Sequence, residues 1–164
     1  MRKSIIITII LFFNVIVFTA QKKYTLTSPD KNIKIDVTAG KEILSYSVTH
    51  NNIVIINDSP ITMELSDGTI LGQKPVVRSY KTTSKEDLIK SNFYKKEYVE
   101  DCYNELTLSL KGNFNLQFKA YNDGVAYRFC TKNSNTQLTI VKEGVTYNFN
   151  NNHKVYIPYV NAGR

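Results

Sequence analysis

The sequence predicts an all-β protein built as an antiparallel β-sandwich. Apolar residues alternate with polar ones in many short runs, turn-forming residues separate these runs, and almost no segment has the spacing of a helix. The clearest stretch extends from Tyr103 to Phe129, where three alternating runs are joined at Gly112-Asn113 and at Asn122-Asp123-Gly124. Gly, Asn and Asp tolerate the positive φ angles of a tight hairpin. We therefore expect an antiparallel meander in this stretch.

The first twenty residues have the pattern of an export signal. Arg2 and Lys3 form a basic start, and the apolar run from Ile5 to Phe18 follows. That run is about 14 residues long, below the ~20 that a helix needs to span a bilayer. We expect residues 1–20 to be a signal peptide, the protein to be exported to the periplasm or secreted, and the chain to have no stable membrane span. Residues 21–164 would then form one sandwich domain.

Short strands follow one another in the first half of this domain. Gln21–Thr27 is expected as a leader or a first edge strand, and Ile53–Ile56 is a continuous apolar run of the kind found in strands buried on both faces. The other expected strands cover Ile33–Val37, Leu44–Val48, Ile61–Leu65 and Val76–Thr83. Turns are expected at Ser28-Pro29-Asp30, His50-Asn51-Asn52 and Asp67-Gly68, and a loop at Asn57–Pro60.

The pattern changes between Thr82 and Tyr98. Ser84-Lys85-Glu86-Asp87 resembles a helix cap, but too few apolar residues follow it to form a helix face. We therefore predict a long exposed loop. After the meander, strands are expected at Gln137–Val141, Val145–Phe149 and Val155–Val160, with a polar turn at Asn150–Asn152 and with Pro158 making the last strand an edge or a bend.

The charge and the cysteines exclude several kinds of site. The net charge is +7, but the densest basic stretch, Lys95-Lys96, is followed directly by acidic residues, so we expect a solvated basic surface and no nucleic-acid partner. Export would permit a disulfide between Cys102 and Cys130. A domain of this length folds without one, and we expect two small, buried and unpaired side chains. These cysteines and the distant His50 and His153 do not supply a metal site.

Three strings resemble a known family. They are LSYSVTH at 44–50, YNELTL at 103–108 and KAYNDGVAYRF at 119–129. From about Ser28 to its end, the chain resembles the N-terminal domain of glycoside hydrolase family 97, whose members are exported bacterial α-glucosidases and α-galactosidases. The resemblance implies a β-sandwich of the galactose-mutarotase type (a supersandwich), with a catalytic (β/α)8 barrel following it. The 164 residues end before a barrel could begin, so residues 21–164 are expected to be a partial N-terminal domain, whose sandwich later strands would complete.

The resemblance implies a non-catalytic module that packs on the catalytic barrel and helps to shape its sugar site. In the family the catalytic carboxylates lie on the barrel, and the N-terminal domain lends a glutamate to a calcium ion. We expect that glutamate beyond Arg164. No catalytic residue, metal ligand or cofactor is therefore assigned within this chain, and calcium is expected only in the full-length enzyme.

The acidic residues support the same expectation. Glycoside hydrolysis needs two carboxylates that face each other roughly 5 to 9.5 Å apart. Four of the acids, Asp30, Asp58, Asp67 and Asp123, are expected at turns, where a carboxylate bonds to its own backbone. Glu105, beside Asn104 at the start of the meander, is the most interesting acid, and we expect a structural role for it.

Two alternatives remain open. The first is an independent carbohydrate-binding or adhesion module, in which tyrosines would stack on sugar faces, although core packing is the default expectation for them. These tyrosines are Tyr94, Tyr98, Tyr103, Tyr121, Tyr147, Tyr156 and Tyr159. The second is a mutarotase-like enzyme, which would require His50 and His153 to meet a carboxylate on one concave sheet.

Overall fold

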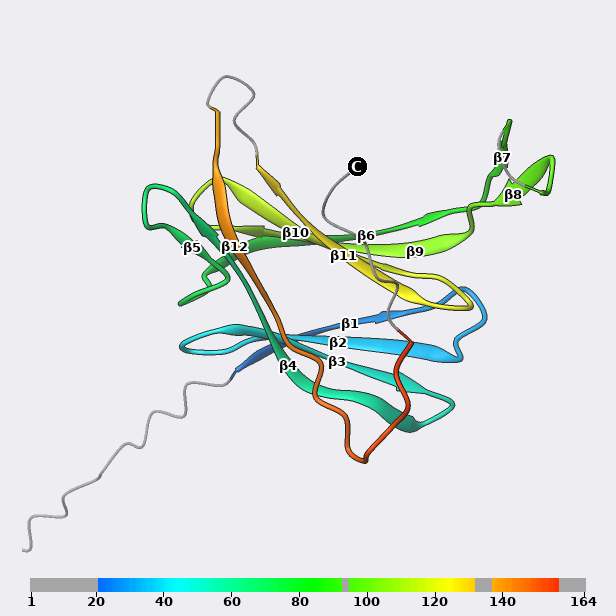
Figure 1. The fold of residues 1–164 in the computed structure, drawn as a ribbon, viewed down its shortest axis with the longest axis horizontal. Coiled ribbons are helices and arrows are strands. Elements are labelled where there is room, and N and C mark those ends of the chain that lie inside the picture. Colours follow the sequence, from blue (N-terminus) through cyan, green and yellow to red (C-terminus); the bar gives the residue numbers. More distant parts are fainter. Residues whose placement is uncertain (1–20, 93–94, 132–136, 157–164) are drawn as a thin grey trace, which may run out of the picture.

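The computed structural model describes residues 21–92, 95–131 and 137–156. The regular structure in these ranges consists of β-strands, and two antiparallel sheets face each other across a hydrophobic core (Figure 1). The predicted all-β sandwich is therefore confirmed. The predicted signal peptide, residues 1–20, lies outside the described residues.

The first sheet contains the N-terminal strands. Its strands are, in order, β1 (Lys22–Thr27), β2 (Ile33–Ala39), β3 (Leu44–His50), β4 (Ile53–Leu65) and β12 (Ile140–Val145), and β5 (Ile70–Leu71) pairs with β4. β1 occupies one edge, as predicted. Alternation has placed Ile33, Ile35 and Val37 of β2 in the core, because successive side chains of a strand point to opposite faces.

The second sheet contains the predicted meander. Its strands are, in order, β11 (Val125–Thr131), β10 (Phe114–Ala120), β9 (Tyr103–Leu110) and β6 (Val77–Lys85). In this sheet Phe118 pairs with Leu106 on one side and with Tyr127 on the other. The inward residues of β9 and β10 are all buried. They are Leu106, Leu108, Leu110, Phe114, Leu116, Phe118 and Ala120.

The two turns of the meander form by different means. Gly112 and Asn113 have φ angles of 100° and 60°, as predicted for a tight turn. The second reversal is a four-residue loop, in which the Tyr121 N–H donates to the Gly124 carbonyl at 2.8 Å. Neither Asp123 nor Gly124 has a positive φ. The reversal was predicted for the wrong reason, because the longer loop turns the chain without a left-handed residue.

The two sheets are held together by aromatic contacts. In the middle of the core the rings of Tyr46 on β3 and Phe118 on β10 lie 5.6 Å apart. At one side, Tyr24 of β1 and Tyr80 of β6 meet edge to face at 5.2 Å. Such pairs add to the stability that their buried area provides.

The prediction that Ile53–Ile56 is buried on both faces is wrong. Ile53, Val54 and Ile55 are 67%, 40% and 41% exposed. This half of β4 pairs with β3, whereas β12 pairs only with the segment from Ile61 to Leu65. The apolar run therefore has no strand on its other side in the described part of the chain.

The predicted loop at Asn57–Pro60 is also wrong, because β4 continues through it. Ser59 is fully buried opposite Tyr46. Its hydroxyl donates to the Asn57 carbonyl at 2.8 Å and accepts from the Asn148 N–H at 2.9 Å. These bonds satisfy the polar groups that suggested a loop, so the strand can run through a polar segment.

The segment between Thr82 and Tyr98 is a hairpin instead of the predicted loop. β6 extends to Lys85, and β7 (Leu88–Lys90) then pairs with β8 (Tyr98–Glu100) in a separate two-stranded sheet. This hairpin projects from the end of the sandwich (Figure 1). Its base is fixed by charge, because the Lys85 ammonium lies 2.7 Å from the Asp101 carboxylate and 3.4 Å from that of Asp87.

The last part of the chain forms one strand where two were predicted. β12 occupies the middle of the region assigned to Gln137–Val141 and Val145–Phe149, and among the described residues after it only Asn148 pairs, in a bridge with Asn57. Val155 and Tyr156 are not in a strand, and residues 157–160 lie outside the described residues.

Candidate functional site

Glu105 lies on the outer face of the second sheet, within a chain of hydrogen bonds. It accepts a bond from the Thr107 hydroxyl at 3.0 Å, and that hydroxyl accepts one from the Gln117 amide at 3.3 Å. Gln117 in turn accepts a bond from Arg128 Nε at 2.6 Å. The neighbouring Asn104 donates to the Thr27 carbonyl at 2.8 Å and so ties the two sheets together. Glu105 is therefore the end of a chain of side-chain hydrogen bonds, a polar ladder, that crosses β9, β10 and β11.

The other acids singled out from the sequence are held by local bonds. Asp30 and Asp67 are in turns: Asp67 accepts from the Thr69 N–H at 2.9 Å, and Asp30 from Ser28 and Asn32. The Ser28 hydroxyl lowers the pKa of Asp30, and the Thr69 backbone lowers that of Asp67. A carboxyl with a lowered pKa is ionised at neutral pH, which is the wrong state for a general acid.

The prediction that Asp58 is a turn residue is wrong, since it lies within β4. Its backbone carbonyl accepts a bond from the Asn148 amide at 2.6 Å. Asp123 lies in the loop between β10 and β11, as predicted.

The two histidines do not form the constellation of a mutarotase-like site. His50 ends β3 and its Nε2 lies 3.3 Å from the Asn51 amide, while the ring of His153 lies 5.9 Å from that of Phe149. Both histidines are exposed.

The described residues do not fit a metal ion. Within 21–92, 95–131 and 137–156, no three His, Cys, Asp or Glu side chains gather closely enough to hold one. The calcium ion that the family resemblance implies would need donors from outside these ranges. In the same ranges, no helix is long and apolar enough to cross a membrane.

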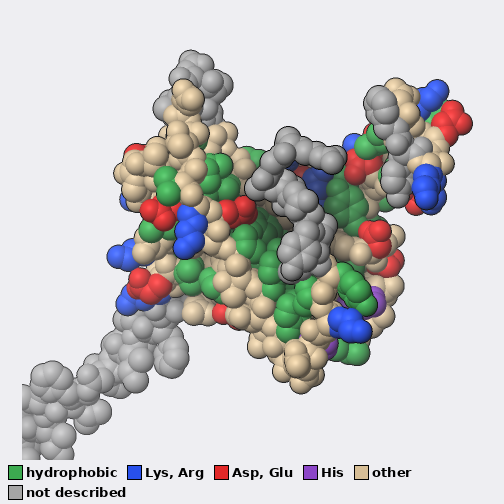
Figure 2. All heavy atoms as spheres, in the orientation of Figure 1, with side chains coloured by type: hydrophobic (Ala, Val, Ile, Leu, Met, Phe, Trp, Pro, Cys, Tyr) green, Lys and Arg blue, Asp and Glu red, His purple; other side chains and the backbone are tan. Residues whose placement is uncertain are grey.

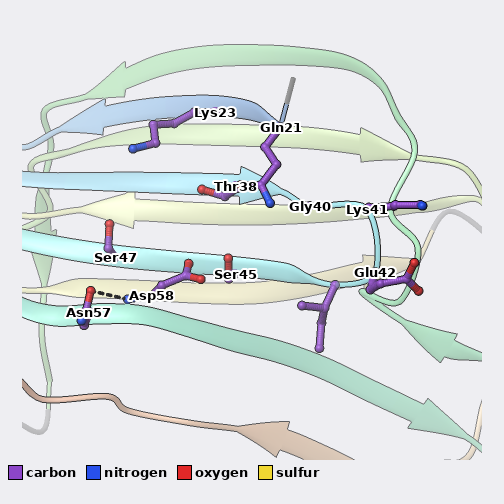
Figure 3. Close-up of a pocket in the computed structure, with 11 residues that line it drawn as sticks. Gln21, Lys23, Thr38, Gly40, Lys41, Glu42, Ser45, Ser47, Asn57 and Asp58 are labelled. Atoms are coloured by element: carbon purple, nitrogen blue, oxygen red, sulfur yellow. Dashed lines mark hydrogen bonds between the residues drawn. The ribbon is translucent and has the colours of Figure 1, made fainter. Parts of the chain in front are cut away.

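A polar groove of about 560 Å³ lies on the outer face of the first sheet (Figure 3). Its floor is made of short side chains, chiefly Thr38, Ser45 and Ser47, and its carboxylates, Glu42 and Asp58, lie toward opposite ends. No aromatic side chain lines the groove. It can hydrogen-bond a polar surface, but it lacks a flat apolar face for a ring-shaped ligand.

A second hollow lies between the β7–β8 hairpin and the β10–β11 loop, and we name it the tyrosine cleft. It comprises two adjoining cavities of about 640 and 630 Å³ that share Glu100, Cys102 and Asn122. The first cavity is also lined by Leu88, Lys96, Tyr98, Val99, Tyr121 and Asp123. Segments far apart in the sequence thus meet around one hollow.

The back of the tyrosine cleft is stiffened by an aromatic and cationic cluster. The ring of Tyr121 lies 5.2 Å from that of Tyr103, and Lys119 Nζ lies 3.7 Å from the centre of the Tyr103 ring. Burial alone would lower the pKa of Lys119, but the Tyr103 hydroxyl and the nearby Tyr121 outweigh this effect and raise that pKa. This cation–π contact, which joins β9 to β10, could not be predicted from the sequence, because it depends on how the two strands pair.

The third surface is the side of the sandwich between β11 and β12, and we name it the open side. Figure 2 shows hydrophobic side chains gathered between the sheets on the face turned to the viewer. Tyr127 and Phe129 of β11 are half-buried, and Tyr147 and Phe149 are 56% and 38% exposed. The Tyr127 hydroxyl donates to Glu143 at 3.2 Å and links β11 to β12. Burial raises the pKa of Tyr127, and the negative charge of Glu143 raises it further.

The default expectation of core packing is wrong for several tyrosines. Tyr98, Tyr147 and Tyr156 are 51%, 56% and 86% exposed, and Tyr103 and Tyr121 are half-buried. Tyr94 and Tyr159 lie outside the described residues. The exposed tyrosines lie at the surface because they belong to the hairpin and to the segment after β12, which no second sheet covers.

The cysteines are unpaired, as predicted, but they are half-buried and not fully buried. Cys102 lines the tyrosine cleft, and the Cys130 thiol lies 3.2 Å from the Gln117 amide oxygen.

Comparison with known proteins identifies the family. The family model described as "Glycosyl-hydrolase 97 N-terminal" matches residues 26–163. Over 145 residues the chain is 38% identical to a retaining alpha-galactosidase of Bacteroides thetaiotaomicron, a match that covers 88% of this chain and 22% of that protein.

Solved structures agree. A glycoside hydrolase family 97 enzyme from Pseudoalteromonas sp. strain K8, in complex with acarbose, matches 78% of this chain and 20% of its own, with a TM-score of 0.69 and 26% identity. A beta-arabinopyranosidase matches with the same TM-score of 0.69 at 20% identity, which shows the shared fold.

The chain spans about a fifth of the length of these relatives. The family match nevertheless extends over most of its sequence, from the second half of β1 through the end of the described residues. This chain therefore belongs to the family of glycosyl-hydrolase 97 N-terminal domains.

Proposed function

We propose that this chain is the non-catalytic N-terminal module of an exported α-glycosidase, which packs on a catalytic barrel and helps to shape its sugar site. The observation that carries the proposal is the combination of two matches. The N-terminal family covers residues 26–163, whereas the retaining alpha-galactosidase that resembles the chain is covered over only 22% of its length. The chemistry would then belong to the part of the longer protein that the chain does not match.

The acids of the chain support a non-catalytic role. A retaining or inverting mechanism needs an acid of raised pKa opposite a second carboxylate. Here Glu105 is engaged in a polar ladder, and Asp30 and Asp67 have lowered pKa values.

The open side is the surface best suited to packing on another domain. It combines half-buried aromatic residues of β11 with exposed ones after β12. Burying such residues against a partner is favourable because apolar surface leaves water. We assign the open side to contact with the remainder of the longer protein.

The relatives suggest the kind of sugar. One is a retaining alpha-galactosidase, and family 97 enzymes of Pseudoalteromonas were solved with acarbose and with panose. We propose an α-linked glucoside or galactoside as substrate of the longer protein, with calcium held by residues outside the described ranges.

Export is part of the proposal. The support is the basic start and the short apolar run of residues 1–20. N-terminal sequencing of periplasmic material should find a mature chain that begins near Gln21. A chain that keeps Met1 and stays in the membrane fraction would contradict export.

The decisive experiment is a hydrolysis assay on the purified chain. Aryl α-glucoside and aryl α-galactoside are incubated with it, with calcium present, and a boiled sample serves as the control. We expect no turnover above that control. Turnover that Glu105→Gln abolishes would overturn the proposal and make Glu105 a catalytic residue.

A mutarotase-like activity is not favoured, because His50 and His153 do not meet a carboxylate within the described ranges. An independent sugar-binding role has a specific observation in its favour, the tyrosine cleft, which the next subsection considers.

A further inference from the structure

We propose that the tyrosine cleft binds an oligosaccharide of pyranose units, separately from any catalytic site. The proposal does not depend on whether the sandwich packs on a catalytic domain. It rests on the shape of the cleft, on the aromatic faces that line it and on the polar groups at its rim.

The shape suits an extended and polar ligand. The two cavities, each above 600 Å³, adjoin at Glu100, Cys102 and Asn122, and both are open to solvent. Sites for small ligands typically enclose 300–1,000 Å³. An open hollow of this size can accept part of a chain of sugar rings while the rest of that chain continues into solvent.

Aromatic faces line one part of the cleft. Tyr98 of β8 is 51% exposed, Tyr121 begins the β10–β11 loop, and both residues line the first cavity. A pyranose ring has one face of C–H groups, and tyrosine offers a flat apolar face with a polar tip that can bond to a hydroxyl. Tyr121 is held in place by the Tyr103 ring at 5.2 Å, so this face needs little ordering when a ligand binds.

The polar groups suit hydroxyls rather than ions. Glu100 and Asp123 offer carboxylates that accept hydrogen bonds, and Lys96 offers a donor. Asn122 accepts a bond from the Asp30 N–H at 3.0 Å, which fixes its side chain and leaves its amide NH₂ to donate. Donors and acceptors are thus both present among the residues that line the hollow, as hydrogen bonding to sugar hydroxyls requires.

Other ligand classes fit this chemistry less well. The carboxylates of Glu86, Glu100 and Asp123 would repel phosphate groups, which argues against a nucleic acid or a phosphorylated ligand. An apolar ligand would need an enclosed, mostly hydrophobic pocket. This hollow is open, and about half of the residues that line it are polar or charged.

The hairpin that forms one wall of the cleft is anchored at its base. Lys85 bridges Asp87 and Asp101 at 3.4 and 2.7 Å, and the Asp101 N–H donates to the Asp87 carbonyl at 2.8 Å. An isolated two-stranded hairpin is marginally stable in water. These contacts at the base hold the hairpin, and with it Tyr98, at the edge of the cleft.

The test measures binding of two soluble oligosaccharides, maltoheptaose and stachyose, to the full chain by isothermal titration and by saturation-transfer NMR. We expect wild type to bind at least one of them. Tyr98→Ala and Asp123→Ala should each weaken that binding about tenfold, since each removes one face or one bonding group. Tyr98→Phe should keep most of the affinity, because the ring face is retained.

The matched control is Tyr156→Ala, which removes a tyrosine that is 86% exposed and does not line the cleft. It should bind as wild type does. Thermal unfolding of every variant verifies the fold, and neither Tyr98 nor Asp123 is buried, so their substitution should leave the fold intact.

Absence of binding to both sugars would overturn the proposal. Binding that neither cleft variant weakens would overturn it too, by placing the sugar elsewhere. The hydrolysis assay is unaffected by either result, so the two proposals fail separately.

Discussion

Cys102 and Cys130 lie toward opposite ends of the second sheet. Cys130 pairs with Asn115, and Asn115 pairs with Ser109, which follows Cys102 by seven residues. At a rise of about 3.3 Å per residue, the two thiols are roughly 20 Å apart along the strands. A disulfide requires Cα atoms within about 7 Å. Thiol titration of the denatured, unreduced protein should therefore find two free groups, and finding none would contradict this prediction.

Tyr46 couples the stability of the core to alkaline pH. Burial raises its pKa to about 12, and the neighbouring Tyr147 adds to the effect. In the unfolded chain the phenol titrates near ~10. The unfolded state therefore loses its proton first, so the stabilising contribution is complete below about pH 10 and is lost as the pH rises toward 12.

We expect Tyr46→Phe to lose less stability than wild type between pH 8 and about pH 11.5. Urea unfolding across this range measures the difference, and Tyr156→Phe, at an exposed site, serves as the control. If wild type and Tyr46→Phe lose stability in parallel, the buried phenol is not the cause.

At the scale of elements, the β4–β5 hairpin requires glycine more strictly at position 72 than at position 68. Gly68 and Gly72 both have positive φ angles, of 82° and 89°. A Cβ at Gly72 would lie 2.4 Å from the carbonyl oxygen of the fully buried Ile61, whereas a Cβ at Gly68 would meet nothing within 4 Å.

Gly72→Ala should therefore lower the free energy of unfolding by about 2 kcal/mol or more, because strain and a backbone clash combine. Gly68→Ala should cost only about 1 kcal/mol, the strain of a left-handed alanine. Urea unfolding of both variants measures the difference. If both variants lose the same free energy of unfolding, the backbone of β4 at Ile61 moves aside to accommodate the added methyl group.

At the scale of the whole molecule, the open side should make the chain self-associate. Exposed aromatic residues there, and the edge of β11, which pairs with no strand within the described ranges, offer surface that another copy can cover. We expect light scattering behind size exclusion to show a mass that rises with protein concentration. The double variant Tyr147→Ser, Phe149→Ser should shift the chain toward monomer, whereas Tyr156→Ser should not. An unchanged mass in the double variant would move the contact to another surface.

The sequence was sufficient for much of the fold. The strands β2, β3, β9, β10 and β11 were predicted because a period of two residues is a local property that neighbouring side chains reveal. The strings at 44–50, 103–108 and 119–129 were sufficient to identify the family. The turn at Gly112-Asn113 was predicted because its positive φ angles depend on the residues themselves.

Only the tertiary structure decided what covers each element and which distant segments meet. Ile53–Ile56 looks like a doubly buried strand, yet Ile53, Val54 and Ile55 are exposed, because β12 pairs with β4 further along. The β7–β8 hairpin was missed because its strands are short and solvent-exposed, so no apolar alternation marks them. The tyrosine cleft exists because that hairpin stands beside the β10–β11 loop, more than twenty residues later in the sequence. Local periodicity indicates which face of a strand is apolar. Burial, and the gathering of Tyr98 and Tyr121 around one cavity, depend on long-range packing, which no local pattern contains.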